Sequence, residues 1–268
     1  MLQLLIVNAD DYGMTQEISR AVLLAHREGI VTSTSVLANG AAFAETARWL
    51  DDAPGLGVGV HLAAVGGDRP LLSPREIPTL CDRDGRLPRS WHQLLLLRPD
   101  PDDLSRELAA QIERVRELGR PVTHLDAHQH VHLWPRLGDV VIALAQKFGI
   151  PAIRVPRSRG RRLTGAAVWA LSRNLACKAK AAGLAYTDAF AGFDEAGRLE
   201  WPRLEHTIRV LGRAHGSAEL CVHPGLGQDA QREGYRCAEE LRAVCAPAAR
   251  EAIDLAGLEL GTYADLAS

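Results

Sequence analysis

The sequence predicts an α/β protein built as a distorted (β/α) barrel of mainly parallel strands, for two reasons. First, short apolar or β-branched runs alternate with longer helical patterns along the chain, which is typical of parallel sheets covered by helices. Second, about seven such units fit into 268 residues, which favours a barrel over an open sheet. No Gly-x-Gly-x-x-Gly follows the first apolar run and no Walker A motif occurs, so nucleotide-binding α/β folds are disfavoured.

The expected strands are short apolar segments. The first, Leu4–Val7, is continuously apolar, as in a strand buried on both faces, and it runs into the sequence Asn-Ala-Asp-Asp. The other expected strands are Thr34–Leu37, Leu56–Leu62, Val122–Asp126, Ala152–Val155, Glu219–His223 and Leu258–Leu260.

Capping residues and helical periodicity define the expected helices. Thr15 is a suitable N-cap for a first helix that stops at Gly29. Pro135 suits the first turn of a later helix, and the Gly-Ile-Pro that begins at Gly149 ends it. This later helix covers 136–147, and the other helical segments are expected near 41–51, 102–118, 164–182, 203–214 and 237–256.

We expect residues 1–268 to form a single catalytic domain. Residues 66–101 break the alternation and are rich in Gly, Pro, Asp and Arg. They are predicted to be a loop insertion near the active site, because long insertions after strands commonly shape such sites.

Composition excludes several kinds of partner. The formal net charge of −2 gives no electrostatic footprint for nucleic acid. No apolar run approaches the ~18–20 residues of a membrane span, and the N-terminus lacks signal-peptide features. Five cysteines without C-x-x-C spacing fit a reducing cytoplasm. Leu94–Leu97 is either part of the core or a contact in a homodimer.

Acidic and histidine side chains fall at the ends of several expected strands. Asp10 and Asp11 follow the first strand, His61 ends the third, and His223 ends the Glu219–His223 strand. In parallel α/β folds these ends meet on one face, where active sites lie. A structural role as a helix-capping turn remains the alternative for one of the two aspartates.

The segment 123–132 holds four of the ten histidines. If it continues as a strand, one face carries His124, Asp126, His128 and His130. If it is helical, His124 and His128 become neighbours. Either arrangement brings two imidazoles together, and imidazoles with a carboxylate suit a divalent metal such as zinc. Arg154 comes directly after Ile153 in another expected strand, and it is either a substrate contact or a salt-bridge partner.

At these positions the chain resembles the YdjC-like carbohydrate deacetylases, which include chitooligosaccharide deacetylases and hopanoid-associated deacetylase-like proteins. The resemblance rests on four motifs in order, Asn-Ala-Asp-Asp-Tyr-Gly at 8–13, Gly-Val-His-Leu at 59–62, Thr-His-Leu-Asp-Ala-His-Gln-His at 123–130 and Val-His-Pro-Gly at 222–225. It extends over nearly the whole chain, and Tyr12 stands where the family often has Phe.

The resemblance implies a barrel of the glycoside hydrolase/deacetylase type and one divalent metal ion, zinc or magnesium, held by Asp11, His61 and His124. It implies Asp10 as general base and His223 as a histidine that lines the same site. In the mechanism that we expect, His223 supplies the proton to the departing amine. The roles of His128 and His130 stay open by this route, as alternative metal ligands, supporting groups or substrate contacts. Asp126 and Arg154 are further candidates for supporting or substrate-contacting residues. The expected reaction is metal-assisted removal of the acetyl group from an acetylated amino sugar.

Two other enzyme classes stay open. A barrel glycosidase would use Asp10 and Asp126 as paired carboxylates, but this leaves the histidines unexplained. A metal-dependent phosphoesterase or amidohydrolase usually begins with a His-x-His pair on the first strand, whereas this strand ends in Asp-Asp. A metal- or sugar-binding module without turnover is the non-enzymatic alternative.

Overall fold

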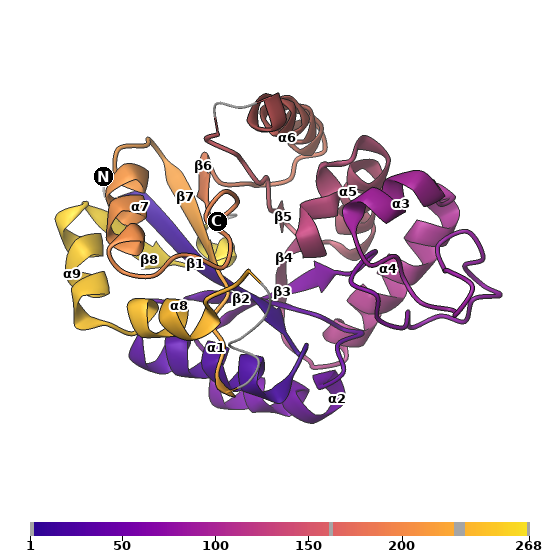
Figure 1. Ribbon diagram of the computed structural model, residues 1–268. Coiled ribbons are helices and arrows are strands. Elements are labelled where there is room, and N and C mark those ends of the chain that lie inside the picture. The colour runs from indigo at the N-terminus through magenta and orange to yellow at the C-terminus, as the bar shows by residue number, and fades with distance from the viewer. Residues whose placement is uncertain (1–2, 161–162, 228–233, 267–268) are drawn as a thin grey trace.

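The computed structural model describes residues 3–160, 163–227 and 234–266. At its centre is one curled sheet with helices packed around it (Figure 1). The strands are β1 (Gln3–Tyr12), β2 (Ser33–Val36), β3 (Gly57–Leu62), β4 (Val122–Ala127), β5 (Ala152–Ile153), β6 (Ala189–Ala191), β7 (Ser217–Val222) and β8 (Leu258–Gly261).

The sheet has the order β5-β4-β3-β2-β1-β7-β6, and all these pairings are parallel. β8 also pairs in parallel with the first part of β1, whereas β2 pairs with its last part. β5 and β6 are the two ends of this order. Among the described residues they do not pair with each other, so the barrel is not closed. The expected fold class, a distorted barrel of parallel strands, is confirmed.

The helices connect successive strands. They are α1 (Gln16–Glu28), α2 (Phe43–Thr46), α3 (Trp91–Leu97), α4 (Pro101–Arg116), α5 (Pro135–Phe148), α6 (Leu163–Ala181), α7 (Arg203–Leu211), α8 (Cys237–Val244), α9 (Pro247–Leu255) and α10 (Tyr263–Leu266), with two 3-10 segments, η1 (Ala47–Asp52) and η2 (His128–Leu133). Thr15 caps α1 as expected, because its hydroxyl accepts a hydrogen bond from the backbone N–H of Ile18 at 3.2 Å. In the described part of the chain, no helix combines the length and apolar character that crossing a membrane requires.

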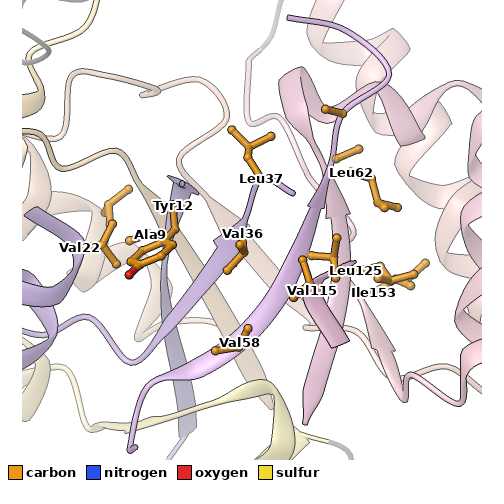
Figure 2. Close-up of a cluster of buried hydrophobic side chains, with 14 of the residues drawn as sticks. Ala9, Tyr12, Val22, Val36, Leu37, Val58, Leu62, Val115, Leu125 and Ile153 are labelled. Atoms are coloured by element: carbon orange, nitrogen blue, oxygen red, sulfur yellow. The ribbon is translucent and has the colours of Figure 1, made fainter. Parts of the chain in front are cut away.

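Apolar side chains fill the space between the sheet and the helices. In Figure 2, Val36, Val58 and Leu125 of three neighbouring strands lie in one cluster with Val115 of α4, and all four are buried. Each such side chain contributes roughly 1.5–3 kcal/mol by leaving water. This core fixes the strands, and therefore fixes the positions of the polar residues at their ends.

Some elements differ from those expected. The helix predicted over 237–256 is two helices, because Pro247 starts a new one at the first-turn position. β6 was missed because three residues give no periodicity. The insertion 66–101 contains α3, which Ser90 caps by accepting from the backbone N–H of Gln93. Of its leucines, Leu94 is buried while Leu96 is 83% exposed.

Candidate metal centre and active site

Asp10 and Asp11 lie where β1 departs from regular geometry. The register between β1 and β2 shifts between Ala9 and Tyr12, and Asp11 has a φ of 69°. Non-glycine residues rarely adopt this left-handed conformation, which costs on the order of 1–3 kcal/mol and is concentrated at functional sites. The two adjacent carboxylates consequently meet different partners, Arg154 for Asp10 and two histidines for Asp11.

Three possible ligand atoms converge on one point. Oδ1 of Asp11 lies 3.4 Å from Nε2 of His61 and 3.1 Å from Nδ1 of His128. The two ring nitrogens are 3.3 Å apart. Ligands bonded at ~2.1 Å to one ion are separated by about 3.0 Å in octahedral and about 3.4 Å in tetrahedral geometry. The donor set and its spacing therefore fit a divalent ion.

His61 is oriented for this role from behind. Its Nδ1 lies 2.8 Å from Oδ1 of Asp126, which leaves Nε2 facing Asp11 and His128. A carboxylate behind a histidine fixes the ring's tautomer and raises its strength as a ligand. Burial lowers the pKa of His61, but Asp126 and Asp10 outweigh it and raise this pKa to about 10. The surroundings thus favour positive charge at this point.

A tight turn places His128 against Asp11. β4 ends at Ala127, and the next residues form the kinked segment η2, in which Gln129 and His130 have φ values of 53° and 54°. The expected end of the strand at Asp126 is thus correct to within one residue, but neither of the two arrangements considered for residues 123–132, a continued strand or a helix, describes the kinked segment that follows Ala127. The left-handed backbone redirects the chain, so that His128 and His130 no longer share a face with His124.

His124 does not join the three converging ligand atoms. Its fully buried ring stacks on Tyr263 at a centroid distance of 3.9 Å and lies 3.2 Å from the Ser35 hydroxyl. It also presses on β3, because a Cβ added to Gly59 would come within 2.2 Å of the ring. Burial lowers the pKa of His124 to about 3. The resemblance had implied His124 as third ligand, whereas the structure brings His128 to that position.

Arg154 is the centre of a buried ion cluster. Its Nη1 and Nη2 donate to Oδ2 and Oδ1 of Asp10 at 2.8 and 2.7 Å. Nη1 also contacts Asp126 at 2.5 Å, and both Nε and Nη2 reach Glu219 at 2.8 Å. Three of these contacts are hydrogen bonds and the other two are ion-pair contacts. Arg154 has no exposed surface, so of the two expected roles its contacts match that of a salt-bridge partner.

The three carboxylates around Arg154 differ in their protonation. Burial raises the pKa of each, but Arg154 and His61 hold the pKa of Asp10 well below its usual value and that of Asp126 at about 2. For Glu219 burial prevails and raises the pKa to about 7. The Tyr263 hydroxyl donates to Glu219 at 2.5 Å, which fixes the carboxyl from the side opposite Arg154.

His223 lies beside Asp10 at the end of β7. Its Nε2 is 4.0 Å from Oδ2 of Asp10, and its backbone N–H donates to Glu240 at 2.7 Å. Cys221, two residues earlier on the same strand, donates its thiol to Oδ2 of Asp10 at 3.2 Å. Oδ2 of Asp10, which accepts a hydrogen bond from Nη1 of Arg154, therefore also has one imidazole and one thiol beside it.

The remaining histidines of the cluster lie further away. His130 stacks on Phe193 with ring centroids 5.2 Å apart, and burial lowers its pKa well below the usual value. His132 is fully buried and donates from Nε2 to the backbone carbonyl of Arg154 at 3.0 Å. His130 thus packs against aromatic side chains, those of Phe190 and Phe193, and His132 helps to fix the backbone at Arg154.

Sequence reasoning missed Glu219, Cys221 and Tyr263 as parts of this site. A signal existed for the first two, because alternation along β7 places Glu219 and Cys221 on the same face as His223. A glutamate inside an otherwise apolar strand needs a buried partner. Tyr263 lies on the last turn of helix and gave no comparable signal.

Comparison with known proteins identifies the family of this chain. The family described as YdjC-like protein matches residues 4–255. The chain belongs to the YdjC-like family. A chitooligosaccharide deacetylase of Serratia marcescens is 32% identical over 272 residues, which cover 99% of this chain and 100% of that protein. A carbohydrate deacetylase of Geobacillus stearothermophilus is 39% identical over 158 residues, 59% of this chain and 62% of that protein, so that match spans less than two thirds of the relative.

Solved structures show the same fold. A candidate cellobiose-phosphate cleavage protein of Enterococcus faecalis V583 superposes with a TM-score of 0.85 at 24% identity, over 100% of both chains. A CE4 family pseudoenzyme of Bacillus anthracis superposes with a TM-score of 0.53 at 11% identity, over 100% of this chain and 66% of that one. At these identities the likeness concerns the fold alone.

Proposed function

We propose that this YdjC-like protein is a metal-dependent hydrolase that removes the N-acetyl group from an acetylated amino sugar. The observation that carries the proposal is the convergence of Asp11, His61 and His128 beside the separate carboxylate of Asp10. Family relatives bear the names carbohydrate deacetylase and chitooligosaccharide deacetylase, which supports the sugar-linked amide as substrate. The metal, the substrate and the 1–268 catalytic unit remain parts of this proposal.

Asp11, His61 and His128 would hold the ion, which when bound supplies a Lewis acid that polarises the acetyl carbonyl and acidifies the attacking water. Asp126 keeps the proton of His61 on Nδ1, so that Nε2 faces the other two ligands. This assignment replaces His124 by His128, because only His128 lies within contact distance of both partners.

Asp10 is proposed as the general base. Its depressed pKa means that it is ionised at neutral pH and ready to accept a proton. The same lowered pKa makes Asp10 a weak base. It therefore accepts the proton only while the water attacks, and it releases the proton again afterwards. His223, 4.0 Å from Oδ2 of Asp10, is the proposed donor of a proton to the departing amine nitrogen.

The glycosidase alternative fits the geometry less well. Asp10 and Asp126 are both bound to Arg154, and oxygens of the two lie within 4.8 Å of each other. Glycosidases place a protonated acid and a carboxylate on opposite sides of the substrate, about 5–9.5 Å apart. Since the pKa values of both aspartates are lowered, neither retains a proton to donate at neutral pH.

Acetate release from N-acetylglucosamine oligosaccharides tests the proposal, measured with and without a chelator. We expect release that the chelator abolishes and that Asp10→Asn reduces by roughly 10²-fold or more, as expected for loss of a general base. His223→Gln, which leaves the contacts of Arg154 intact, gives a second test if Asp10→Asn fails to fold. Asp139→Asn on the exposed face of α5 is the matched control, and it should retain full activity.

Absence of acetate release from every acetylated sugar, with the ion bound and the protein folded, would refute the proposed activity. Release that is indifferent to the chelator would refute the metal dependence alone. Release that survives Asp10→Asn unchanged would remove the general-base assignment and leave the metal site standing.

A further inference from the structure

A second set of ligand atoms lies beside the candidate metal centre. Sγ of Cys221 and Nε2 of His223 lie 3.2 and 4.0 Å from Oδ2 of Asp10. All three atoms lie within 4.8 Å of one another. Within the described ranges, the other two groups of possible ligands contain only nitrogen and oxygen donors, so this group alone offers sulfur.

We propose that Asp10, Cys221 and His223 form an inhibitory binding site for a soft divalent cation such as Cd²⁺ or Zn²⁺. Thiolate and imidazole ligands select soft and borderline ions, whereas Mg²⁺ and Mn²⁺ prefer oxygen. The centre at Asp11, by contrast, has no sulfur. The two neighbouring sites thus differ in the softness of their ligands.

The present spacing is close to that of a filled site. With bonds of ~2.3 Å to sulfur and ~2.0–2.1 Å to nitrogen and oxygen, ligand atoms of a tetrahedral ion lie about 3.3–3.5 Å apart. The Cys221–Asp10 pair is already at 3.2 Å, and the His223–Asp10 pair has to shorten from 4.0 Å. His223 is the most exposed of the three at 11%, so its ring is the group that adjusts, and the ion enters on its side.

The charge of the surrounding interior favours a cation. Asp10 and Asp126, whose pKa values are lowered, share one guanidinium, that of Arg154, with the partly ionised Glu219. Binding breaks the S–H bond of Cys221, forms a sulfur–metal bond and releases the proton to solvent. The positive charge of the ion then offsets the new thiolate and part of the surplus of carboxylates.

The inhibitory consequence rests on the proposed function, because Asp10 and His223 are the groups assigned there to proton transfer. An ion bound to both would occupy the lone pair of Asp10 that accepts the proton and the nitrogen of His223 that donates one. The binding itself does not depend on any reaction. Binding and activity therefore test the two proposals separately.

The binding experiment uses the full-length protein preloaded with Mg²⁺ and titrated with CdCl₂. A thiolate–Cd²⁺ charge-transfer band in the near ultraviolet should saturate as one ion binds. Cys221→Ser should lose this band, and Cys221→Ala serves as a second variant with folding verified by circular dichroism. Cys177→Ser is the matched control, because Cys177 is an exposed free thiol on α6, and it should keep the band.

A band of full intensity in folded Cys221→Ser or Cys221→Ala would overturn the site, as would a wild-type band lost in Cys177→Ser. In the activity arm, the Cd²⁺ concentration for half-inhibition, normalised to each variant's own uninhibited rate, should rise at least about tenfold in Cys221→Ser. If no deacetylase activity exists but the band behaves as stated, the site stands and only the proposed function fails.

Discussion

Arg154 donates from both terminal nitrogens to the two oxygens of Asp10, at 2.8 and 2.7 Å, and neither residue is more than 2% exposed. A bidentate pair of this kind fixes the plane of the carboxylate as well as its position. The same guanidinium contacts Asp126, which orients His61. One buried cation therefore connects the proposed general base to the proposed metal centre.

Replacement of Arg154 by lysine should impair catalysis more than binding. An ammonium group keeps the charge but has no planar fork, so Asp10 loses the bidentate contact that fixes the plane of its carboxylate. Because a misplacement of about 1 Å costs on the order of 10²-fold in rate, we expect kcat to fall by roughly that factor while KM changes little. Steady-state kinetics with metal analysis checks this. A fall in bound metal parallel to kcat would show a structural role instead.

The fold followed from the sequence because short apolar segments such as Leu4–Val7 alternate with helices that begin at clear caps, as at Thr15 and Pro135. The local path after β4 did not follow. The sequence His-Leu-Asp-Ala-His-Gln-His alternates like a strand, and only the left-handed backbone at Gln129 and His130 ends it. Tertiary contacts impose such a conformation, so no local sequence pattern predicts it.

His128 and His124 should respond differently to substitution. Removing the imidazole in His128→Ala takes away one of three converging donors, so we expect a loss of at least about tenfold in metal affinity. His124→Gln should keep the metal, because the ring lies against Tyr263 and Gly59. It should instead lower the free energy of unfolding by about 1–3 kcal/mol, through lost packing and hydrogen bonding.

Metal content by atomic emission and urea unfolding of both variants separate these effects. Loss of metal in His124→Gln with retention in His128→Ala would restore the ligand set implied by the family resemblance. Loss in both would indicate that His124 acts through the backbone of β3 and β4.

The candidate site was only partly predictable for a related reason. Asp10, Asp11, His61 and His223 were recognisable because polar residues that end apolar strands of a parallel sheet converge. Whether Arg154 meets substrate or a carboxylate depends on distances between β1, β4 and β7, which no single segment encodes. The supporting ion cluster therefore emerges only once the sheet order is known.

Glu219 should make stability depend on pH. Burial raises its folded-state pKa from 4.5 to about 7, so the folded protein binds a proton that the unfolded chain has released. The stabilisation from this proton is fully present below pH ~4.5 and is lost as pH rises through about 7, a change of roughly 3 kcal/mol. Glu219→Gln keeps the shape without the titration. In urea unfolding from pH 5 to 8, the free energy of unfolding of Glu219→Gln minus that of the wild type should rise with pH. A difference that stays constant over this range would contradict the prediction.

Gln129 should tie the 66–101 segment to the turn that carries His128. Its side-chain amide donates to the backbone carbonyl of Arg89 and accepts from the N–H of Trp91, both at 3.1 Å. In Gln129→Ala both bonds are lost, and since each is worth about 0.5–1.5 kcal/mol, hydrogen exchange at the Trp91 amide should accelerate about tenfold. Gln129→Gly should show the same exchange but be more stable than the alanine variant by roughly 1 kcal/mol, because glycine accepts the φ of 53° without strain. Equal stability of the two variants would mean that this backbone is not strained, and unchanged exchange at Trp91 would mean that other contacts hold the segment in place.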